Sequence, residues 1–235
     1  MKAVFSDIDG TLSKGFVSVD FIRYLGAKGI LDKKSFALHE SLMADYKNGK
    51  IKYADLVPKW SQSVAECFNG FTPVELKAKA NEFFSEWKKE NIYSSTKPLI
   101  KLLKEKGYLV FLISAGWDYL AELVAKEIGA DEAVGLEIKI ENGKYLNITG
   151  NLMFLEKGKS NAIQTLIKQH KINLQKTIGL GDSIQDKAIF ENVHKPIALN
   201  PSKELKEKAL KENWYLATHE NVLEMMGRCF NKEKK

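Results

Sequence analysis

Near the N-terminus the chain reads Ala3-Val4-Phe5-Ser6-Asp7-Ile8-Asp9-Gly10-Thr11. An apolar run without alternation, here residues 3–5, is typical of a strand that is buried on both faces of a parallel sheet. Asp7 and Asp9 would then leave the carboxyl end of this strand, the edge at which open α/β sheets bind ligands. A DxDGT segment alone could also be a solvated loop, so its meaning depends on the rest of the chain.

Further apolar runs predict the other strands of the sheet, at residues 109–113, 177–180, 196–199 and 214–217. Two sets of apolar residues recur at helical spacing between these runs: Trp117, Leu120, Ala121, Val124 and Ala125, then Ala162, Ile163, Leu166 and Ile167. Strands that alternate with helices indicate an α/β fold, a doubly wound parallel sheet with helices on both faces. Residues 135–155 instead predict a hairpin whose turn is Glu141-Asn142-Gly143-Lys144.

The second strand comes nearly a hundred residues after the first, which indicates a large insertion. Residues 14–90 contain several amphipathic helical segments and no convincing strand. One helix begins at Thr72-Pro73-Val74-Glu75, a capping box with proline at the first helical position. We therefore predict an α/β core of residues 1–13 and 91–235 and an all-helical cap of residues 14–90. A cap inserted there would cover the carboxyl ends of the strands.

Composition limits the class of protein. The 235 residues are 44% hydrophobic and carry a net charge of +6, with the basic residues spread along the chain. A nucleic-acid-binding surface would cluster them among aromatic residues, so no nucleic-acid partner is expected. No apolar run reaches about 18 residues, and the chain enters a strand by Ala3, so neither a membrane span nor a signal peptide is expected. Widely spaced Cys67 and Cys229 and four unclustered histidines favour a cytoplasmic protein without zinc.

A second acidic motif, Gly181-Asp182-Ser183-Ile184-Gln185-Asp186, follows the run at 177–180. In a parallel sheet its carboxylates fall on the same edge as Asp7 and Asp9. Four such carboxylates repel one another, so we expect a hard divalent cation with oxygen ligands between them. Mg²⁺, which bridges carboxylates and phosphate groups, fits this expectation best.

Two further features indicate a phosphate site. Ser114-Ala115-Gly116 follows the run at 109–113, where a hydroxyl and backbone N–H groups can hold a phosphate, although Ser114 could also be an ordinary N-cap. Lys159 opens the helix before the run at 177–180, in conflict with the helix dipole, and its ammonium could reach a phosphate. Lys157 is the competing lysine.

These residues suit phosphoryl transfer, which needs positioning and charge neutralisation around the transferred group. Asp7 would attack phosphorus, and Asp9 would protonate the leaving alcohol and then deprotonate the hydrolytic water. Ser114 and Lys159 would hold the phosphoryl oxygens, and Mg²⁺ would shield Asp7 from the charge of the phosphate.

Taken together, the motifs make the chain similar to the haloacid dehalogenase superfamily of phosphatases, in its phosphoserine-phosphatase-like branch. The motifs that carry the resemblance are residues 7–11, Ser114, Lys159 and residues 181–186, in the order of that superfamily. The resemblance implies a Rossmann-like catalytic core with a helical cap after the first strand. It also implies Mg²⁺ held by Asp7, the backbone carbonyl of Asp9 and Asp182. It implies phosphate contacts from Ser114, Ala115 and Lys159, and supporting roles for Gly10, Thr11, Gly116, Ser183 and Asp186.

The resemblance predicts a magnesium-dependent phosphomonoesterase that acts on a small phosphorylated metabolite. Phosphoserine phosphatases carry a glutamate for the substrate's ammonium shortly after the first motif, where this chain has Phe16. Phe16 could offer only a cation–π contact, and Trp117 could line the pocket or belong to the core. The alternatives are a phosphoserine phosphatase in the strict sense, a phosphotransferase with the same intermediate, and a non-catalytic regulatory module.

Overall fold

The computed structural model describes residues 1–151, 153 and 155–231. Its elements in chain order are β1 (Lys2–Ser6), α1 (Val17–Ala27), α2 (Lys33–Lys47), α3 (Tyr53–Phe68), α4 (Pro73–Asn91), α5 (Thr96–Glu105), β2 (Tyr108–Trp117), α6 (Asp118–Ile128), β3 (Glu132–Leu136), β4 (Ile138–Glu141), β5 (Lys144–Thr149), α7 (Glu156–Gln169), η1 (Leu174–Lys176), β6 (Thr177–Gly181), η2 (Ile184–Asp186), α8 (Lys187–Phe190), β7 (Lys195–Leu199), α9 (Lys203–Lys211), β8 (Tyr215–Ala217) and α10 (Val222–Asn231). None of these helices is both long and apolar enough to cross a membrane.

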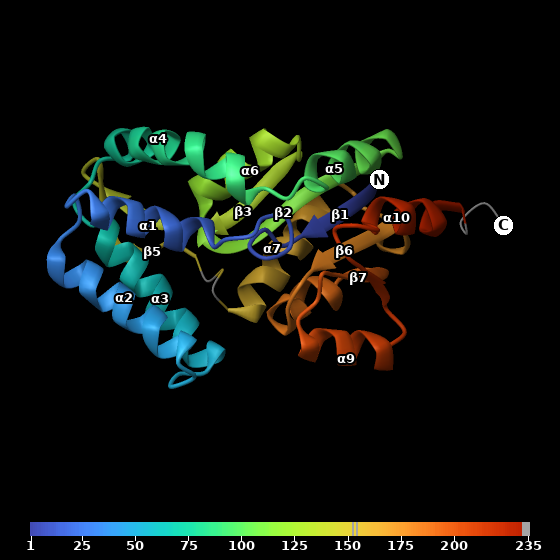
Figure 1. Cartoon of the computed structure of the whole chain (residues 1–235). Helices are drawn as coiled ribbons and strands as arrows, with labels where there is room; N and C mark the ends of the chain where they lie inside the picture. The colour runs from blue at the N-terminus through green and yellow to red at the C-terminus, as the bar shows by residue number, and fades with distance from the viewer. Residues whose placement is uncertain (152, 154, 232–235) are drawn as a thin grey trace.

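Six parallel strands form the central sheet, in the order β3-β2-β1-β6-β7-β8 (Figure 1). The chain runs from β1 to β2 and β3 on one side, then returns to β6 on the other side of β1. The strand order therefore reverses between β1 and β6, and their carboxyl ends form the crevice where such sheets bind ligands. Ser6 pairs with Leu180 there, and the Asp7 N–H donates to the Leu180 carbonyl at 3.0 Å.

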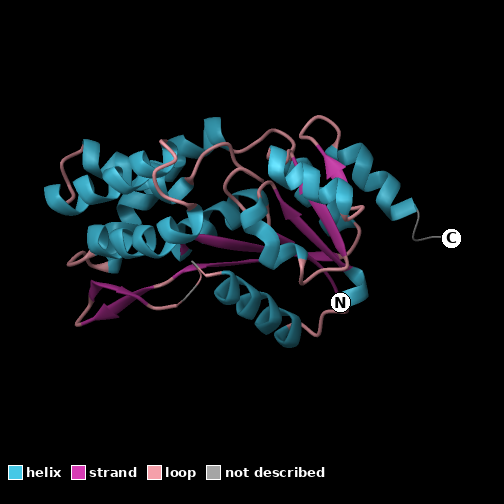
Figure 2. Cartoon of the chain, turned by 90° about the horizontal axis from the view of Figure 1, so that it is seen from below, coloured by secondary structure: helices cyan, strands magenta, loops and turns pink. Residues whose placement is uncertain are grey.

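Helices cover both faces of the sheet (Figure 2). Apolar residues of α5, α6 and α10 pack on one face in the same core cluster as Val4 and Val110, and α7 and α8 pack with Phe5 and Phe111 on the other. The strand residues Ala3, Val4 and Phe5 are fully buried because both faces are covered. The predicted Rossmann-like α/β fold is confirmed.

The sheet has one strand that the sequence pattern did not predict. β3 is an edge strand that pairs only with β2, and its first three residues are half-buried, so it lacks a continuous apolar run. The predicted hairpin at 135–155 overlaps the end of β3; the observed hairpin is β4–β5, with Asn142 and Gly143 at φ 50° and 76° in its turn. Residues 152 and 154 of the predicted span lie outside the described residues.

Residues 14–90, all of them described, form helices and no strand. The predicted capping box is present: the Thr72 hydroxyl accepts from the Glu75 N–H at 3.2 Å, and the Thr72 N–H donates to the Glu75 carboxylate at 2.9 Å. Backbone bonds also join this segment to the β4–β5 hairpin, between Gly70 and Tyr145 and between Tyr145 and Phe71. The exact division into core and cap stays a prediction.

Aromatic packing holds the helical segment over the end of β2. Phe21 of α1 stacks on Trp117 with ring centroids 5.8 Å apart, and Phe68 of α3 meets Trp117 edge-on at 4.9 Å. All three side chains are almost completely shielded from solvent. One apolar cluster therefore runs from the sheet into the helices above it.

The contact between α2 and α3 contains a buried histidine. His39 Nδ1 lies 3.0 Å from Ser63 Oγ, and the Ser63 hydroxyl donates to the Trp60 carbonyl at 2.7 Å. Since that hydroxyl has a single hydrogen, His39 must donate from Nδ1. Burial lowers the pKa of His39 from 6.5 to about 4, so the ring is neutral in the folded protein at neutral pH.

His39→Gln is expected to flatten the pH dependence of stability between pH 6.5 and about 4. The pKa is lower in the folded state, so the wild type keeps its full stability above pH 6.5. As the pH falls below 6.5, protons bind the unfolded chain first, and the free energy of unfolding decreases by roughly 3 kcal/mol down to about pH 4. Urea unfolding of both proteins from pH 4 to 8 measures the difference, and the values at pH 8 isolate the effect on packing. Parallel loss of stability in the two proteins would contradict this assignment.

Candidate functional site

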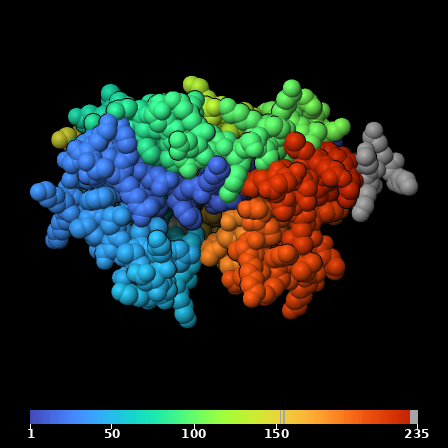
Figure 3. Space-filling view, in the orientation of Figure 1, coloured from blue at the N-terminus to red at the C-terminus, as the bar shows by residue number. Residues whose placement is uncertain are grey.

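A cavity of about 420 Å³ opens at the carboxyl ends of β1 and β6, beneath α1, α2 and α3. The space-filling view shows the surface hollowed between the segment around residue 50 and the segment that follows β6 (Figure 3). The sheet side of the cavity is lined by Asp7, Asp9, Ser114, Ala115, Gly116, Lys159, Asp182, Ser183 and Asp186. Residues that the sequence predicted from separate motifs therefore face one cavity.

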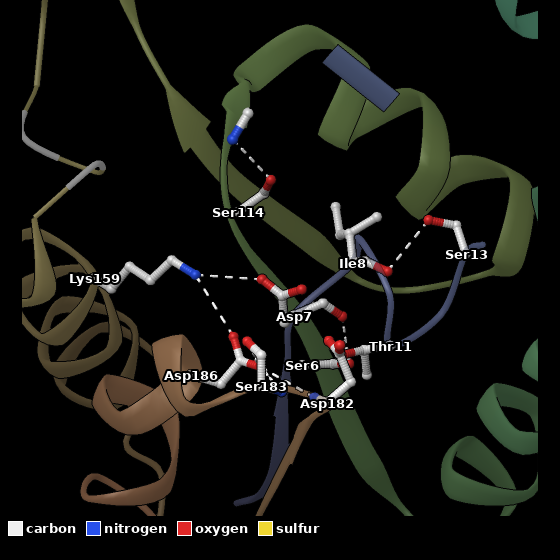
Figure 4. Close-up of polar contacts among 11 residues, drawn as sticks. Ser6, Asp7, Ile8, Thr11, Ser13, Ser114, Lys159, Asp182, Ser183 and Asp186 are labelled. Carbon is white, nitrogen blue, oxygen red and sulfur yellow. Dashed lines mark hydrogen bonds and ion pairs between the residues drawn. The ribbon is translucent and has the colours of Figure 1, made fainter. Parts of the chain in front are cut away.

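Lys159 reaches the carboxylate that follows β1. Its Nζ donates to Asp7 Oδ1 at 3.2 Å and lies 3.8 Å from Asp186 Oδ1 (Figure 4). The lysine belongs to the first turn of α7 and is 6% exposed, whereas Lys157 of the same turn is exposed on the surface. Of the two lysines that the sequence left open, the structure brings only Lys159 into the site.

The turn after β6 is organised by Asp186. Its Oδ2 accepts from the N–H groups of Asp182 and Ser183 at 3.0 and 3.1 Å and lies 3.3 Å from the Ser183 hydroxyl. The Thr11 hydroxyl donates to Asp182 Oδ1 at 2.9 Å and so links the two acidic motifs. Gly10 has φ +92°, and a Cβ there would lie 2.6 Å from Asp182 Oδ2, so this approach requires glycine.

Asp9 has a different environment from Asp7. Its Oδ1 accepts from the N–H of Val17, the first residue of α1, at 2.9 Å. Burial raises the pKa of Asp9 to about 7, and the Val17 bond only partly opposes this shift. A carboxyl with this pKa can donate and accept a proton near neutral pH.

Ser114 lies inside β2, which corrects the sequence interpretation. The sequence places the segment 114–116 between a strand that ends at residue 113 and the following helix, with an N-cap as one alternative for Ser114. Instead β2 continues to Trp117, with a bulge in its pairing to β3, and α6 begins at Asp118. The Ser114 Oγ accepts from the Gly116 N–H at 2.9 Å. A Cβ on Gly116 would lie 2.6 Å from Ser18 Oγ, so α1 approaches this bulge closely.

The electrostatics of the site favour a bound cation. Burial, followed by repulsion from Asp186, raises the pKa of Asp7 well above its usual range and that of Asp182 to about 6. Burial alone would lower the pKa of Lys159, but the carboxylates of Asp7 and Asp186 outweigh it and raise the pKa. One lysine does not balance this many carboxylates, which are costly to ionise together in a buried site.

Oxygen atoms of Asp7, Asp182 and Asp186 all lie within 4.8 Å of one another. An all-oxygen, all-carboxylate set suits a hard divalent cation such as Mg²⁺. The residues therefore fit the ion that the sequence predicts. Asp186, which was given only a supporting role, has an oxygen in the same cluster as Asp7 and Asp182.

The remaining predicted residues divide into two groups. Phe16 lines the cavity and is 57% exposed, whereas Trp117 is fully buried in the core and is not part of the described lining. Sequence reasoning missed Arg23 and Tyr53, which also line the cavity. Burial raises the pKa of Tyr53 to about 12, with smaller effects from Lys159 and the acidic residues of the site. No local pattern marks these two residues, because their position depends on how α1 and α3 pack over the sheet.

The chain is similar to known hydrolases and phosphatases. The family model described as haloacid dehalogenase-like hydrolase matches residues 4–191. A phosphoserine phosphatase of Archaeoglobus fulgidus is 29% identical over 126 residues, which are 51% of this chain and 37% of that enzyme. A histidinol-phosphatase of Neisseria meningitidis serogroup C is 25% identical over 220 residues, covering 90% of this chain and 96% of that protein.

Among solved structures, a substrate-bound phosphoserine phosphatase complex superimposes with a TM-score of 0.67. It is 21% identical in sequence, and the match covers 97% of each chain. At this identity the likeness concerns the fold, which is the same arrangement of sheet and helices described above.

Proposed function

Because the chain belongs to the haloacid dehalogenase-like hydrolase family, we propose that it is a magnesium-dependent phosphomonoesterase that forms an aspartyl-phosphate on Asp7. Its substrate is a small phosphorylated metabolite. The main support is the juxtaposition of Asp7 with Lys159 at 3.2 Å and with Asp182 in one acidic cluster, inside a cavity at the crevice of the sheet.

Asp7 and Asp9 divide the chemistry between them. An Asp7 oxygen attacks phosphorus, and the bond from phosphorus to the ester oxygen breaks while the Asp9 carboxyl gives its proton to the leaving alcohol. Asp9 then takes a proton from water as that water attacks phosphorus, which releases inorganic phosphate and the Asp7 carboxylate. The pKa of about 7 for Asp9 suits both directions of proton transfer.

The phosphoryl oxygens are bound by three groups that come from two elements. The Ser114 hydroxyl and the Ala115 N–H come from the end of β2, and the Lys159 ammonium comes from α7. Such donors stabilise the charge that develops on the transferred group. Gly116 leaves room for the close approach of α1 to this edge.

Asp7, the backbone carbonyl of Asp9, and Asp182 would hold the Mg²⁺, and Asp186 would orient Lys159 or a water on the ion. When bound, the ion neutralises the negative charge of the site so that carboxylate and phosphate can approach each other. Thr11 and Ser183 orient Asp182 and Asp186 through the hydrogen bonds already described.

Residues 14–90 act in this proposal as a cap over the crevice, and residues 1–13 and 91–235 carry the chemistry. The cytoplasmic location expected from the sequence is part of the same proposal. A phosphotransferase would use the same intermediate with an alcohol in place of water, and a phosphoserine phosphatase in the strict sense would need a partner for the substrate's ammonium.

A panel of phosphorylated metabolites, with acetyl phosphate included, tests the activity. We expect release of inorganic phosphate from one or more members, and an acid-stable, base-labile label on the protein after brief exposure to ³²P-labelled substrate. Adding glycerol separates the alternatives, since a phosphotransferase would form glycerol phosphate at the expense of inorganic phosphate. Lack of turnover with every member, acetyl phosphate included, would refute the proposal.

A further inference from the structure

The cavity continues beyond the reacting groups into a half that is walled by the helical segment. Its lining includes the apolar or aromatic side chains of Phe16, Tyr46, Tyr53, Leu56, Val57 and Trp60. They come from the residue that precedes α1, the end of α2 and the first half of α3, so one face of the insert is turned to the site. We infer that the alcohol part of the substrate is apolar and carries no ammonium group, an inference that rests on the proposed function.

The charges of the cavity support this substrate class. Asp7, Asp9, Asp182 and Asp186 are the carboxylates of the described lining, and all belong to the reacting half. The charged residues that residues 14–90 contribute to the lining are two cations, Arg23 and Lys47.

Arg23 has an acidic partner, Glu40, but this partner adds no carboxylate to the described lining of the cavity. Arg23 Nε donates to Glu40 at 3.0 Å, and Glu40 is not part of the lining. An ammonium on the substrate would therefore lose water without gaining a carboxylate in this half, which is unfavourable.

Phe16 lies next to the residue that binds the Asp9 carboxyl, the group that would protonate the leaving alcohol. It directly precedes Val17, whose N–H binds the Asp9 carboxyl, and Asp9 is the proposed proton donor to the leaving alcohol. Its ring is 57% exposed although it faces a cavity lined by other aromatic residues. An apolar group bound there would remove this ring from water and contact aromatic faces, both of which favour binding.

The volume of the cavity also suits a phosphate ester with an apolar alcohol part. Its volume of about 420 Å³ lies within the range of roughly 300–1,000 Å³ that is usual for sites of small organic ligands. It therefore has room for a ring or a short alkyl chain beside the phosphate.

A matched pair of substrates tests the inference on the full chain with Mg²⁺. 2-Phenylethyl phosphate and 2-aminoethyl phosphate share the same ester linkage and differ in carrying a phenyl ring or an ammonium. We expect kcat/KM to be at least ~10-fold higher for the phenyl compound, the scale that hydrophobic pockets give. Hexyl phosphate distinguishes an aliphatic from an aromatic preference, and either preference over the amine supports the inference.

Two variants of Phe16 refine the test. Phe16→Glu places a carboxylate at the exposed position and is expected to shift the ratio of the two kcat/KM values toward the amine by ~10-fold or more. Phe16→Leu keeps the position apolar and is expected to retain the preference for the phenyl compound. Acetyl phosphate, which has no alcohol part, normalises the activity of each variant. Because the ring is exposed, neither change removes a core contact.

Two outcomes would overturn the inference, and they are distinguishable. If aminoethyl phosphate, phosphoserine or histidinol phosphate equals or exceeds phenylethyl phosphate while acetyl phosphate is turned over, the substrate class is wrong and the proposed function stands. If neither the esters nor acetyl phosphate are turned over, both the proposed function and the inference that rests on it fail.

Discussion

Asp7→Asn is expected to lower kcat by ~10⁴-fold or more, the scale of removing a nucleophile from an active site, while the protein remains folded. A carboxamide does not attack phosphorus to give an acyl phosphate, so the first step is lost. Burial raises the pKa of Asp7, which means that its charge is costly in the folded state, so a neutral side chain should not lower the melting temperature. The backbone bond from this residue to Leu180 is unaffected. Initial rates and thermal unfolding measure the two effects separately.

The matched control for this change is Asp55→Asn. Asp55 is an exposed residue of α3 outside the cavity lining, and the same chemical change there should leave kcat near the wild-type value. Near-normal turnover by Asp7→Asn would show that another group attacks phosphorus and would remove the nucleophile assignment.

Removal of divalent metal is expected to lower activity by at least ~100-fold, and added magnesium is expected to restore it. The physical reason is the acidic cluster, in which buried carboxylates have raised pKa values and Lys159 is the cation of the described lining closest to them. Magnesium should also raise the melting temperature of the inactive Asp7→Asn variant less than that of the wild type, because a ligand of the ion is weakened. Rates with chelator, and rates and melting curves across a magnesium titration, give these values.

Thr11→Val tests whether the Thr11 hydroxyl supports the proposed metal site. The valine lacks the hydroxyl that orients Asp182, so the magnesium concentration at half-maximal rate should rise by ~10- to 100-fold. Thr165→Val, an exposed position on α7, is the control and should leave it unchanged. Activity indifferent to chelator would remove the metal from the proposal, and an unchanged magnesium requirement in Thr11→Val would remove the orienting role of Thr11.

Some strands of the sheet are easier to predict from the sequence than others. The runs at 3–5 and 177–180 lie in the middle of the sheet, where burial on both faces demands continuous apolar residues, and both were predicted. β3 lies at the edge, tolerates half-buried residues and was missed. The apolar run at 109–113 ends before β2 does, because Ser114, Ala115 and Gly116 are small or polar; the strand continues through them to Trp117, with a bulge in its pairing to β3.

The acidic part of the site could be predicted because its two motifs lie directly at the carboxyl ends of β1 and β6. Parallel strands bring their carboxyl ends to one edge, so short-range patterns imply that Asp7 and Asp182 lie together even though they are far apart in the chain. Only the tertiary structure decided that Lys159 rather than Lys157 enters the site, that Trp117 is buried, and that Arg23 and Tyr53 line the cavity. These features depend on the rotation and docking of helices over the sheet, and long-range side-chain packing settles that geometry without leaving a periodic signal in the sequence.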